Sequence, residues 1–173
     1  MKKIIVAKGQ IFNFAKIEVK PGLMFDMVDH PGAVVILPVK DDMTVVMIKQ
    51  YRPLIEQVMI SCPAGCIEPG EKPIITAARE LKEETGYTAR QIIPMTFHYS
   101  SCGMTNERVE MFLAFGLTPG EQELEPTESI EVIEMTFDKA LKMVQDHEIT
   151  QSHDITALLY AQQFCRGRDF DRK

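Results

Sequence analysis

The sequence predicts a single α+β domain that spans residues 1–173. Short apolar stretches separated by turn residues fill the first third of the chain, a pattern typical of antiparallel strands. One segment near the middle has the apolar spacing of an amphipathic helix, and more strand-like stretches and two helical segments follow it. Because strands and helices do not alternate regularly, these observations indicate an α+β or mixed sandwich and not a parallel βαβ sheet. A chain of 173 residues that is 45% hydrophobic is long enough for one core and short for two.

Residues 1–30 are predicted to form an N-terminal antiparallel strand region. Two lysines and a short apolar run without a cleavage-site pattern follow Met1, which indicates a strand and not a signal peptide. The expected strands, separated by turn residues, are Ile4–Ala7, Ile11–Val19 and Leu23–Val28. Two further stretches, Ala33–Val39 and Thr44–Lys49, flank a polar turn and are expected to pair with each other as antiparallel strands.

The middle of the chain changes to a helical period. Residues 73–85 have apolar positions at Ile74, Ala77, Ala78 and Leu81. Pro73 suits the first turn of this helix, and Gly86 suits the left-handed position after its last turn. The remaining expected elements are, in order, strands Gln91–Tyr99 and Arg108–Leu117, an acidic loop at residues 121–129, strand Ile130–Thr136, and helices Phe137–Asp146 and Asp154–Phe164.

The overall charge and the cysteine spacing exclude several classes of protein. A formal net charge of −6 argues against broad binding to nucleic acid or to anionic membranes. No apolar run reaches membrane-spanning length, so the cytoplasm is the expected location. The four cysteines, Cys62, Cys66, Cys102 and Cys165, lack zinc-site spacing with the scattered histidines, and we expect free thiols in a reducing compartment.

Three glutamates, Glu80, Glu83 and Glu84, crowd into five positions of the predicted helix. At about 100° per residue, Glu83 and Glu84 lie within about 60° of Glu80, on the face opposed to the apolar residues. Like charges at this spacing repel. The face is therefore either merely solvated, with Arg79 paired to Glu83 one turn away, or it holds a cation. Hard divalent cations such as Mg²⁺ prefer carboxylate oxygens, and carboxylates three and four residues apart can reach one point.

The glutamates belong to a longer pattern with fixed spacing: Gly65, then Glu71, then Arg79-Glu80-Leu81-Lys82-Glu83-Glu84-Thr85-Gly86-Tyr87. This stretch resembles the Nudix box, Gx5Ex7REUxEExGU, where U is a bulky apolar residue and Tyr87 fills the last apolar site. The resemblance implies a Nudix-type α/β/α sandwich around a mixed β-sheet, with residues 65–87 as a loop–helix–loop. It also implies a hydrolase that cleaves a nucleoside diphosphate linked to another group, with Mg²⁺ or Mn²⁺ as cofactor.

The resemblance assigns catalytic roles to residues of the box. It implies that Glu80, Glu83 and Glu84 are metal ligands, joined by the backbone carbonyl of Ala64. Arg79 is implied to hold the glutamates in place by ion pairing. Bound cations would bridge the diphosphate, polarise its oxygens and lower the pKa of a bound water that becomes the nucleophile.

Three further residues of the box have implied structural roles. Glu71 would brace the geometry of the loop and the helix. Gly65 and Gly86 would allow tight backbone turns at the two ends of the box.

Outside the box, four stretches are similar to the ADP-ribose pyrophosphatase branch of the family. They are Gln50-Tyr51-Arg52, Pro63-Ala64-Gly65, Ser101-Cys102-Gly103 with Glu107, and Glu128-Ser129-Ile130-Glu131-Val132. This resemblance implies that Glu107 contacts the substrate between the diphosphate and the terminal sugar. Arg52 would lie near the diphosphate or support a dimer contact, and the alternative is a plain surface arginine. Glu128 would be the catalytic base or an extra metal ligand, with Glu125 as the substitute, and the alternative is a solvated acidic loop.

The N-terminal strands also resemble this branch, whose members often exchange that region in a homodimer. Two positions depart from the branch pattern: Cys102 stands where a proline is usual, and Ser61 stands where an acidic residue is usual. Both lie where the substrate is selected. The expected reaction is hydrolysis of ADP-ribose to AMP and ribose 5-phosphate. The alternatives are another nucleotide sugar, a nucleoside triphosphate, or a non-catalytic module that senses a nucleotide sugar.

Overall fold

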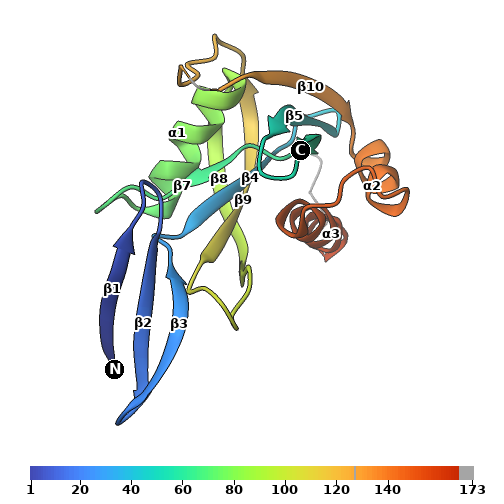
Figure 1. The fold of residues 1–173 in the computed structure, drawn as a ribbon. Coiled ribbons are helices and arrows are strands. Elements are labelled where there is room, and N and C mark those ends of the chain that lie inside the picture. Colours follow the sequence, from blue (N-terminus) through green and yellow to red (C-terminus); the bar gives the residue numbers. More distant parts are fainter. Residues whose placement is uncertain (127, 168–173) are drawn as a thin grey trace.

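The computed structural model describes residues 1–126 and 128–167, and these residues form three sheets and three helices (Figure 1). The N-terminal sheet has the order β1-β2-β3 and consists of β1 (Lys2–Lys8), β2 (Asn13–Lys20) and β3 (Leu23–Asp29), all antiparallel. Figure 1 shows this sheet extending away from the rest of the molecule. The three N-terminal strands were expected from the sequence, and the structure confirms them.

A four-stranded mixed sheet carries the first helix. Its order is β7-β4-β9-β8, built from β7 (Ala64–Cys66), β4 (Ala33–Pro38), β9 (Arg108–Thr118) and β8 (Thr88–Tyr99). Strands β4 and β9 run parallel, and the other pairs are antiparallel. Helix α1 (Pro73–Thr85) packs on one face, where Ala77 and Leu81 contact the side chains that alternate residues of β4 and β9 turn toward them. The mixed sheet and the α+β class are therefore as the sequence predicts.

A second, antiparallel sheet with the order β10-β5-β6 lies on the other side of the core. Its strands are β10 (Ile130–Thr136), β5 (Thr44–Arg52) and β6 (Gln57–Ser61). Helices α2 (Phe137–Gln145) and α3 (Ser152–Gly167) complete the larger hydrophobic core, in which buried residues of β4, β5 and β9 meet both helices. In the part of the chain that the structure describes, no helix is long and apolar enough to cross a membrane.

The predicted pairing of residues 33–39 with residues 44–49 is wrong. These consecutive strands lie in different sheets and share a single bridge, between Val39 and Val45. The turn between them does form, since the N–H of Lys40 donates to the carbonyl of Thr44. The neighbours of each strand come instead from distant segments, because β7 and β9 flank β4 while β10 and β6 flank β5. Strands β6 and β7 were missed because each is short and Cys62-Pro63 separates them.

The two ends of α1 follow the sequence signals. Pro73 occupies the first turn, where its missing N–H costs nothing. Gly86 has a φ of 74°, and its N–H donates to the carbonyl of Lys82 at 2.8 Å. A Cβ at Gly86 would lie 2.5 Å from the carbonyl oxygen of Gly120. Glycine is thus required here both by the left-handed backbone and by the close approach of the loop that leads to β10.

Asp154, in the first turn of α3, is fully buried and fixes this helix to the segment that precedes β7. Its Oδ1 accepts from the N–H of Cys62 at 2.9 Å, and its Oδ2 accepts from Nε2 of Gln151 at 3.1 Å. Burial raises the pKa of this carboxyl to about 7. Nε2 of His153 lies 3.7 Å away, and burial lowers the pKa of that imidazole to about 4, so it is neutral near pH 7.

We expect the Asp154→Asn variant to lose much of the pH dependence of folding. In the unfolded chain an aspartate has a pKa of about 3.9, so the protonated carboxyl stabilises the fold by up to about 4 kcal/mol below that pH. This contribution disappears as the pH rises from about 4 to about 7. An asparagine keeps the acceptor for Cys62 and cannot ionise. Thermal unfolding at pH 5 and pH 8 should therefore show a smaller difference in Tm for this variant than for the wild type.

The control for this prediction is Asp146→Asn, which removes an exposed carboxylate paired with Lys142 at 2.7 Å. Exposed pairs of this kind contribute little to stability, so this variant should retain the pH profile of the wild type. Equal pH profiles for Asp154→Asn and the wild type would show that Asp154 does not titrate between pH 5 and pH 8.

Candidate active site

A cavity of about 540 Å³ lies between α1, β7, the turn before β2 and the acidic loop. Its lining includes six predicted site residues, namely Ala64, Gly65, Arg79, Glu80, Glu83 and Glu128, together with Glu125. The structure therefore gathers on one surface residues that are up to 64 positions apart, from Ala64 to Glu128.

Arg79 organises the carboxylates of this cavity. Its Nη1 donates to Oε1 of Glu80 at 2.7 Å and to Oε2 of Glu83 at 2.9 Å. Its Nε and Nη2 donate to the two oxygens of Glu71 at 3.2 and 3.1 Å, and Nη2 also reaches the carbonyl of Cys66. The geometry is that of the ion pairing that the family resemblance implies. One guanidinium thus fixes two carboxylates of the helix face relative to the preceding loop.

Glu71 links that loop to the start of the helix. Besides pairing with Arg79, its Oε2 accepts from the hydroxyl of Thr76 at 2.8 Å and from the N–H of Glu68 at 3.4 Å. Hydrogen bonds from Arg79 are the largest cause of the lowered pKa of this carboxyl. Glu71 therefore stays ionised. Its hydrogen bonds to both the loop and α1 hold these two segments together.

Gly65 is needed for a different reason from the one expected. The sequence suggested a tight turn, yet its backbone lies in β7 and has no positive φ. A Cβ at this position would lie 1.9 Å from Oε1 of Glu80 and 2.5 Å from its Oε2. The carboxylate of Glu80 thus rests directly against the α-carbon of Gly65, and any larger residue would displace it.

Glu84 lies behind the surface of the cavity, only 3% exposed. Its Oε2 accepts from the N–H of Ala64 at 2.8 Å, which joins α1 to β7. Burial is the largest cause that raises its pKa to about 8, and the charges of Glu80 and Glu128 raise it further. The pKa of Glu80 is also raised by burial, with additional contributions from Glu83 and Glu128. The carboxylates of this site repel one another, which is the environment that a bound cation relieves.

The acidic loop is docked onto the end of α1. Nε2 of Gln122 donates to the carbonyl of Glu84 at 2.6 Å, and the N–H of Glu123 donates to the carbonyl of Glu83 at 3.0 Å. Within the loop, the N–H of Glu125 donates to Oε2 of Glu128 at 3.0 Å. Glu125 and Glu128 both line the cavity, Glu125 exposed and Glu128 half-buried, and this position favours the functional interpretation over the solvated loop.

Five predicted site residues do not line this cavity, namely Arg52, Glu71, Glu84, Gly86 and Glu107. Arg52, at the end of β5, is half-buried, and its charge lowers the pKa of Glu84 against the larger effect of burial. Glu107 lies beside a separate hollow lined by Phe12 and Val28, with its Oε1 at 3.6 Å from Nδ1 of His30. Glu107 therefore lines a different hollow from the other predicted residues, and its contact with the substrate stays a prediction.

The structure adds residues that the sequence did not indicate. Gln10 and Ile11, at the tight turn before β2, line the carboxylate-lined cavity together with Pro31 and Cys66. Their position depends on how the N-terminal sheet sits against the loop before α1, and no local pattern reports this.

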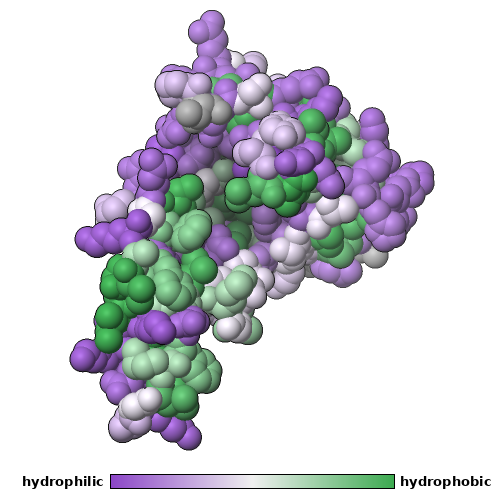
Figure 2. Space-filling model, viewed as in Figure 1, coloured by the Kyte–Doolittle hydropathy of each residue, from purple (hydrophilic) through white to green (hydrophobic). Residues whose placement is uncertain are grey.

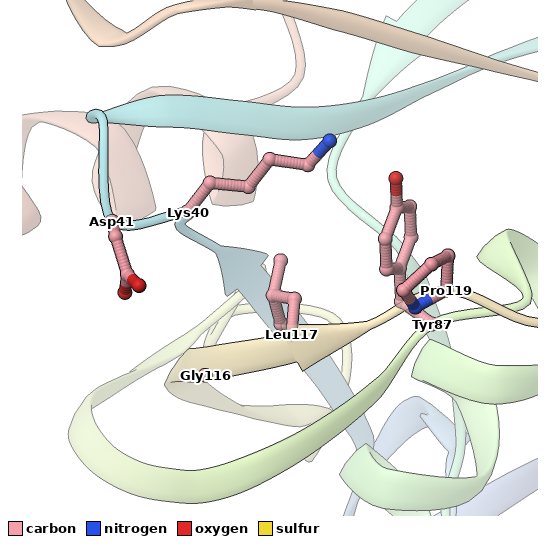
Figure 3. A pocket seen from close by; sticks show the side chains of 6 residues that line it. All are labelled: Lys40, Asp41, Tyr87, Gly116, Leu117 and Pro119. Atoms are coloured by element: carbon pink, nitrogen blue, oxygen red, sulfur yellow. The ribbon is translucent and has the colours of Figure 1, made fainter.

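A smaller hollow of about 270 Å³ lies beyond the C-terminal end of α1 (Figure 3). Lys40 and Tyr87 point toward one another across it in Figure 3, and both contact Oε1 of Glu134 at 2.6 Å. This explains the tyrosine at the last apolar site of the box, because the ring packs against the core cluster under α1 while the hydroxyl donates to Glu134. None of the predicted catalytic residues lies here.

The fold and the carboxylate-lined cavity are those of a Nudix hydrolase. The comparison with known proteins supports this class. Residues 29–155 match the family described as NUDIX domain, and the chain belongs to this family. It is 42% identical over 139 residues to the ADP-ribose pyrophosphatase of Bacillus subtilis (strain 168), covering 79% of this chain and 75% of that protein. With the same coverage it is 36% identical to the methanol dehydrogenase activator of Bacillus methanolicus. A solved structure of an ADP compounds hydrolase matches 96% of this chain and 93% of that chain with a TM-score of 0.79, and at 21% identity this shows the shared fold.

Nudix hydrolases generally use divalent metal ions. The carboxylate side chains of this cavity are suitable ligands for such an ion. Among residues 1–126 and 128–164, no three acidic, histidine or cysteine side chains surround one point as metal ligands do. Arg79 pairs with Glu80 and Glu83, two of the predicted ligands. The donor set nevertheless consists of carboxylate oxygens, one of them on a buried residue with a raised pKa, and this is the chemistry that hard divalent cations select.

Proposed function

We propose that this chain hydrolyses the pyrophosphate bond of a nucleoside diphosphate sugar, with ADP-ribose as the preferred substrate. Water adds to one phosphorus, the bridging P–O bond breaks, and AMP and ribose 5-phosphate are released. The observation that carries the proposal is the cavity in which Arg79, Gly65 and the acidic loop hold four carboxylates on one surface. The relatives named ADP-ribose pyrophosphatase support the choice of substrate.

We assign the following roles to the residues of the cavity. Glu80, Glu83 and Glu84, with the carbonyl of Ala64, would hold Mg²⁺, or Mn²⁺ in its place. The cation supplies charge neutralisation for the diphosphate and activates a water. Arg79 and Glu71 are positioning residues, because they contact the carboxylates and not the reacting atoms. Glu128, which lines the cavity without pairing to a basic side chain in any described contact, would accept the proton of the attacking water.

We also propose that the protein acts in the cytoplasm as a homodimer. The N-terminal sheet supports the dimer, because it exposes apolar side chains on a segment that extends from the body of the molecule, namely Ile4, Ile5, Val6, Phe14, Leu23 and Phe25. Figure 2 shows this apolar surface on the N-terminal sheet. Light scattering measures the mass directly, and a monomer at micromolar concentration would exclude the dimer.

The test of function is a hydrolysis panel in the presence of Mg²⁺, with product analysis. It compares ADP-ribose, other nucleoside diphosphate sugars and nucleoside triphosphates by kcat/KM. We expect ADP-ribose to give AMP and ribose 5-phosphate with the highest kcat/KM. A triphosphate as the best substrate would contradict the proposal, and binding of a nucleotide sugar without turnover would indicate a sensor.

A further inference from the structure

Residues of the acidic loop cap the C-terminal end of α1. The last four carbonyls of an α-helix have no partner within the helix. In α1, two of these carbonyls belong to Glu83 and Glu84, whose side chains are proposed metal ligands. The carbonyl of Glu83 accepts from the N–H of Glu123 at 3.0 Å, and that of Glu84 accepts from Nε2 of Gln122 at 2.6 Å. A segment about 40 positions further along the chain thus completes this helix end.

Gln122 supplies the side-chain part of the cap. An amide nitrogen has two N–H groups, and Nε2 of Gln122 also reaches the carbonyl of Ile130, the first residue of β10, at 3.4 Å. One amide therefore links the end of α1 to both ends of the acidic loop. Gln122 is an exposed residue, so these hydrogen bonds, and not burial in the core, determine where its side chain lies.

The backbone just before Gln122 lies directly against the end of α1. A Cβ at Gly120 would lie 2.9 Å from the carbonyl oxygen of Gly86, and a Cβ at Gly86 would lie 2.5 Å from that of Gly120. Gly120 has no positive φ, so this contact is what requires glycine there. The two glycines let the backbones approach closely enough for Gln122 to reach the carbonyl of Glu84.

Charge opposes this docking of the loop. The loop carries four carboxylates, and it faces a helix turn that carries Glu83 and Glu84 as well as the partial negative charge of a helix C-terminus. The four are Glu121, Glu123, Glu125 and Glu128. The exposed ion pair between Lys82 and Glu123, at 2.7 Å, offsets little of this repulsion. The docking therefore depends on N–H donors directed at the carbonyls of α1, and a neutral amide provides one without adding charge.

The position of Glu128 depends on the same loop. Its Oε2 accepts from the N–H of Glu125 at 3.0 Å, and its own N–H donates to the carbonyl of Glu125 at 2.9 Å. Both residues line the cavity together with Glu80 and Glu83. Since this turn belongs to the loop and the loop is attached to α1, the attachment sets the place of Glu128 relative to the carboxylates of the helix.

We propose that Gln122 is a positioning residue of the reaction, which holds the acidic loop on the end of α1 and so fixes Glu128 relative to Glu83 and Glu84. Gln122 does not line the cavity, and it acts through Glu128. The inference rests on the proposed function, in which Glu128 accepts the proton of the attacking water.

The first test is the Gln122→Met variant, which keeps the length of the side chain and removes its donor. With ADP-ribose and Mg²⁺, we expect kcat to fall about tenfold, the effect of one lost hydrogen bond. KM should change less than twofold, because the residues that line the cavity are all present. A kcat equal to that of the wild type would overturn the proposal.

Lys82→Gln is the matched control. It removes an exposed contact between the same helix and the same loop, the ion pair of Lys82 with Glu123, and should leave kcat unchanged. An equal loss of kcat in Lys82→Gln and Gln122→Met would assign the effect to any disturbance of the loop and would overturn the specific role of Gln122.

A double-mutant cycle separates positioning of Glu128 from a general effect on the fold. Glu128→Gln removes the proton acceptor, so a residue that acts only through Glu128 has nothing left to position in that background. We expect Gln122→Met to lower kcat by less than twofold when Glu128→Gln is already present. The same tenfold loss in both backgrounds would show that Gln122 acts by another route.

Hydrogen exchange at the N–H of Glu123 tests the attachment without catalysis. This N–H donates to the carbonyl of Glu83, and in metal-free Gln122→Met it should exchange about tenfold faster than in the wild type. Faster exchange, combined with a wild-type protein that hydrolyses no nucleotide sugar, would refute the proposed function and retain the attachment of the loop. Hydrolysis of ADP-ribose by the wild type, with exchange and kcat both unchanged in Gln122→Met, would retain the enzyme and refute the role of Gln122.

Discussion

The Glu84→Gln variant should lose about 10³-fold in kcat on ADP-ribose with Mg²⁺ while it keeps its fold. Glutamine has nearly the same shape, and its Oε1 can still accept from the N–H of Ala64, so the contact between α1 and β7 survives. It carries no charge, and the site loses an anionic ligand in a buried position where no water can replace it. The loss should therefore appear in turnover and not in stability.

Steady-state kinetics and thermal unfolding of the same preparation check this expectation. The Tm should be equal to that of the wild type or higher, because burial disfavours the ionised form of Glu84 and glutamine removes that cost. Glu131→Gln is the control, since Glu131 is an exposed carboxylate paired with Lys49 at 3.3 Å, and it should keep full activity. Near-wild-type turnover in Glu84→Gln would refute the assignment of the carboxylate face as the metal site.

The Gly65→Ala variant should lose about 10²-fold in kcat through displacement of Glu80. A Cβ cannot lie 1.9 Å from a carboxylate oxygen, so the side chain of Glu80 must move away from its position against β7. The hydrogen bond of 2.7 Å from Arg79 would then break or shift as well. A misplacement of about 1 Å in a catalytic group costs roughly this factor. The measurement is kcat as a function of Mg²⁺ concentration, where we expect a higher requirement for the metal.

Gly70→Ala, five residues further along the chain, should give the opposite result. A Cβ at Gly70 meets nothing within 4 Å, but the φ of 85° disfavours alanine. This variant should lose about 1 kcal/mol of stability and keep its activity. If Gly65→Ala keeps its activity, Glu80 does not need its position against β7, and the explanation given for this glycine is wrong.

The sequence by itself determined helix α1 and its carboxylate face. Residues 73–85 form that helix, and the three glutamates share one side of it, because helical periodicity and the signals of Pro73 and Gly86 act within a few residues. The α+β class followed from the order of strand-like and helical stretches in the same way. Such local features persist whatever the rest of the chain does.

Tertiary structure alone decided which strands pair and which residues meet. Both β4 and β5 carry side chains buried on their two faces, so their local pattern favoured a hairpin as strongly as the observed separation into two sheets. The contact of Glu80 with Gly65 and the hydrogen bond between buried Glu84 and Ala64 likewise join segments far apart in the chain. These positions result from the packing of whole sheets and helices against each other, a balance of many small contacts that no short stretch of sequence encodes.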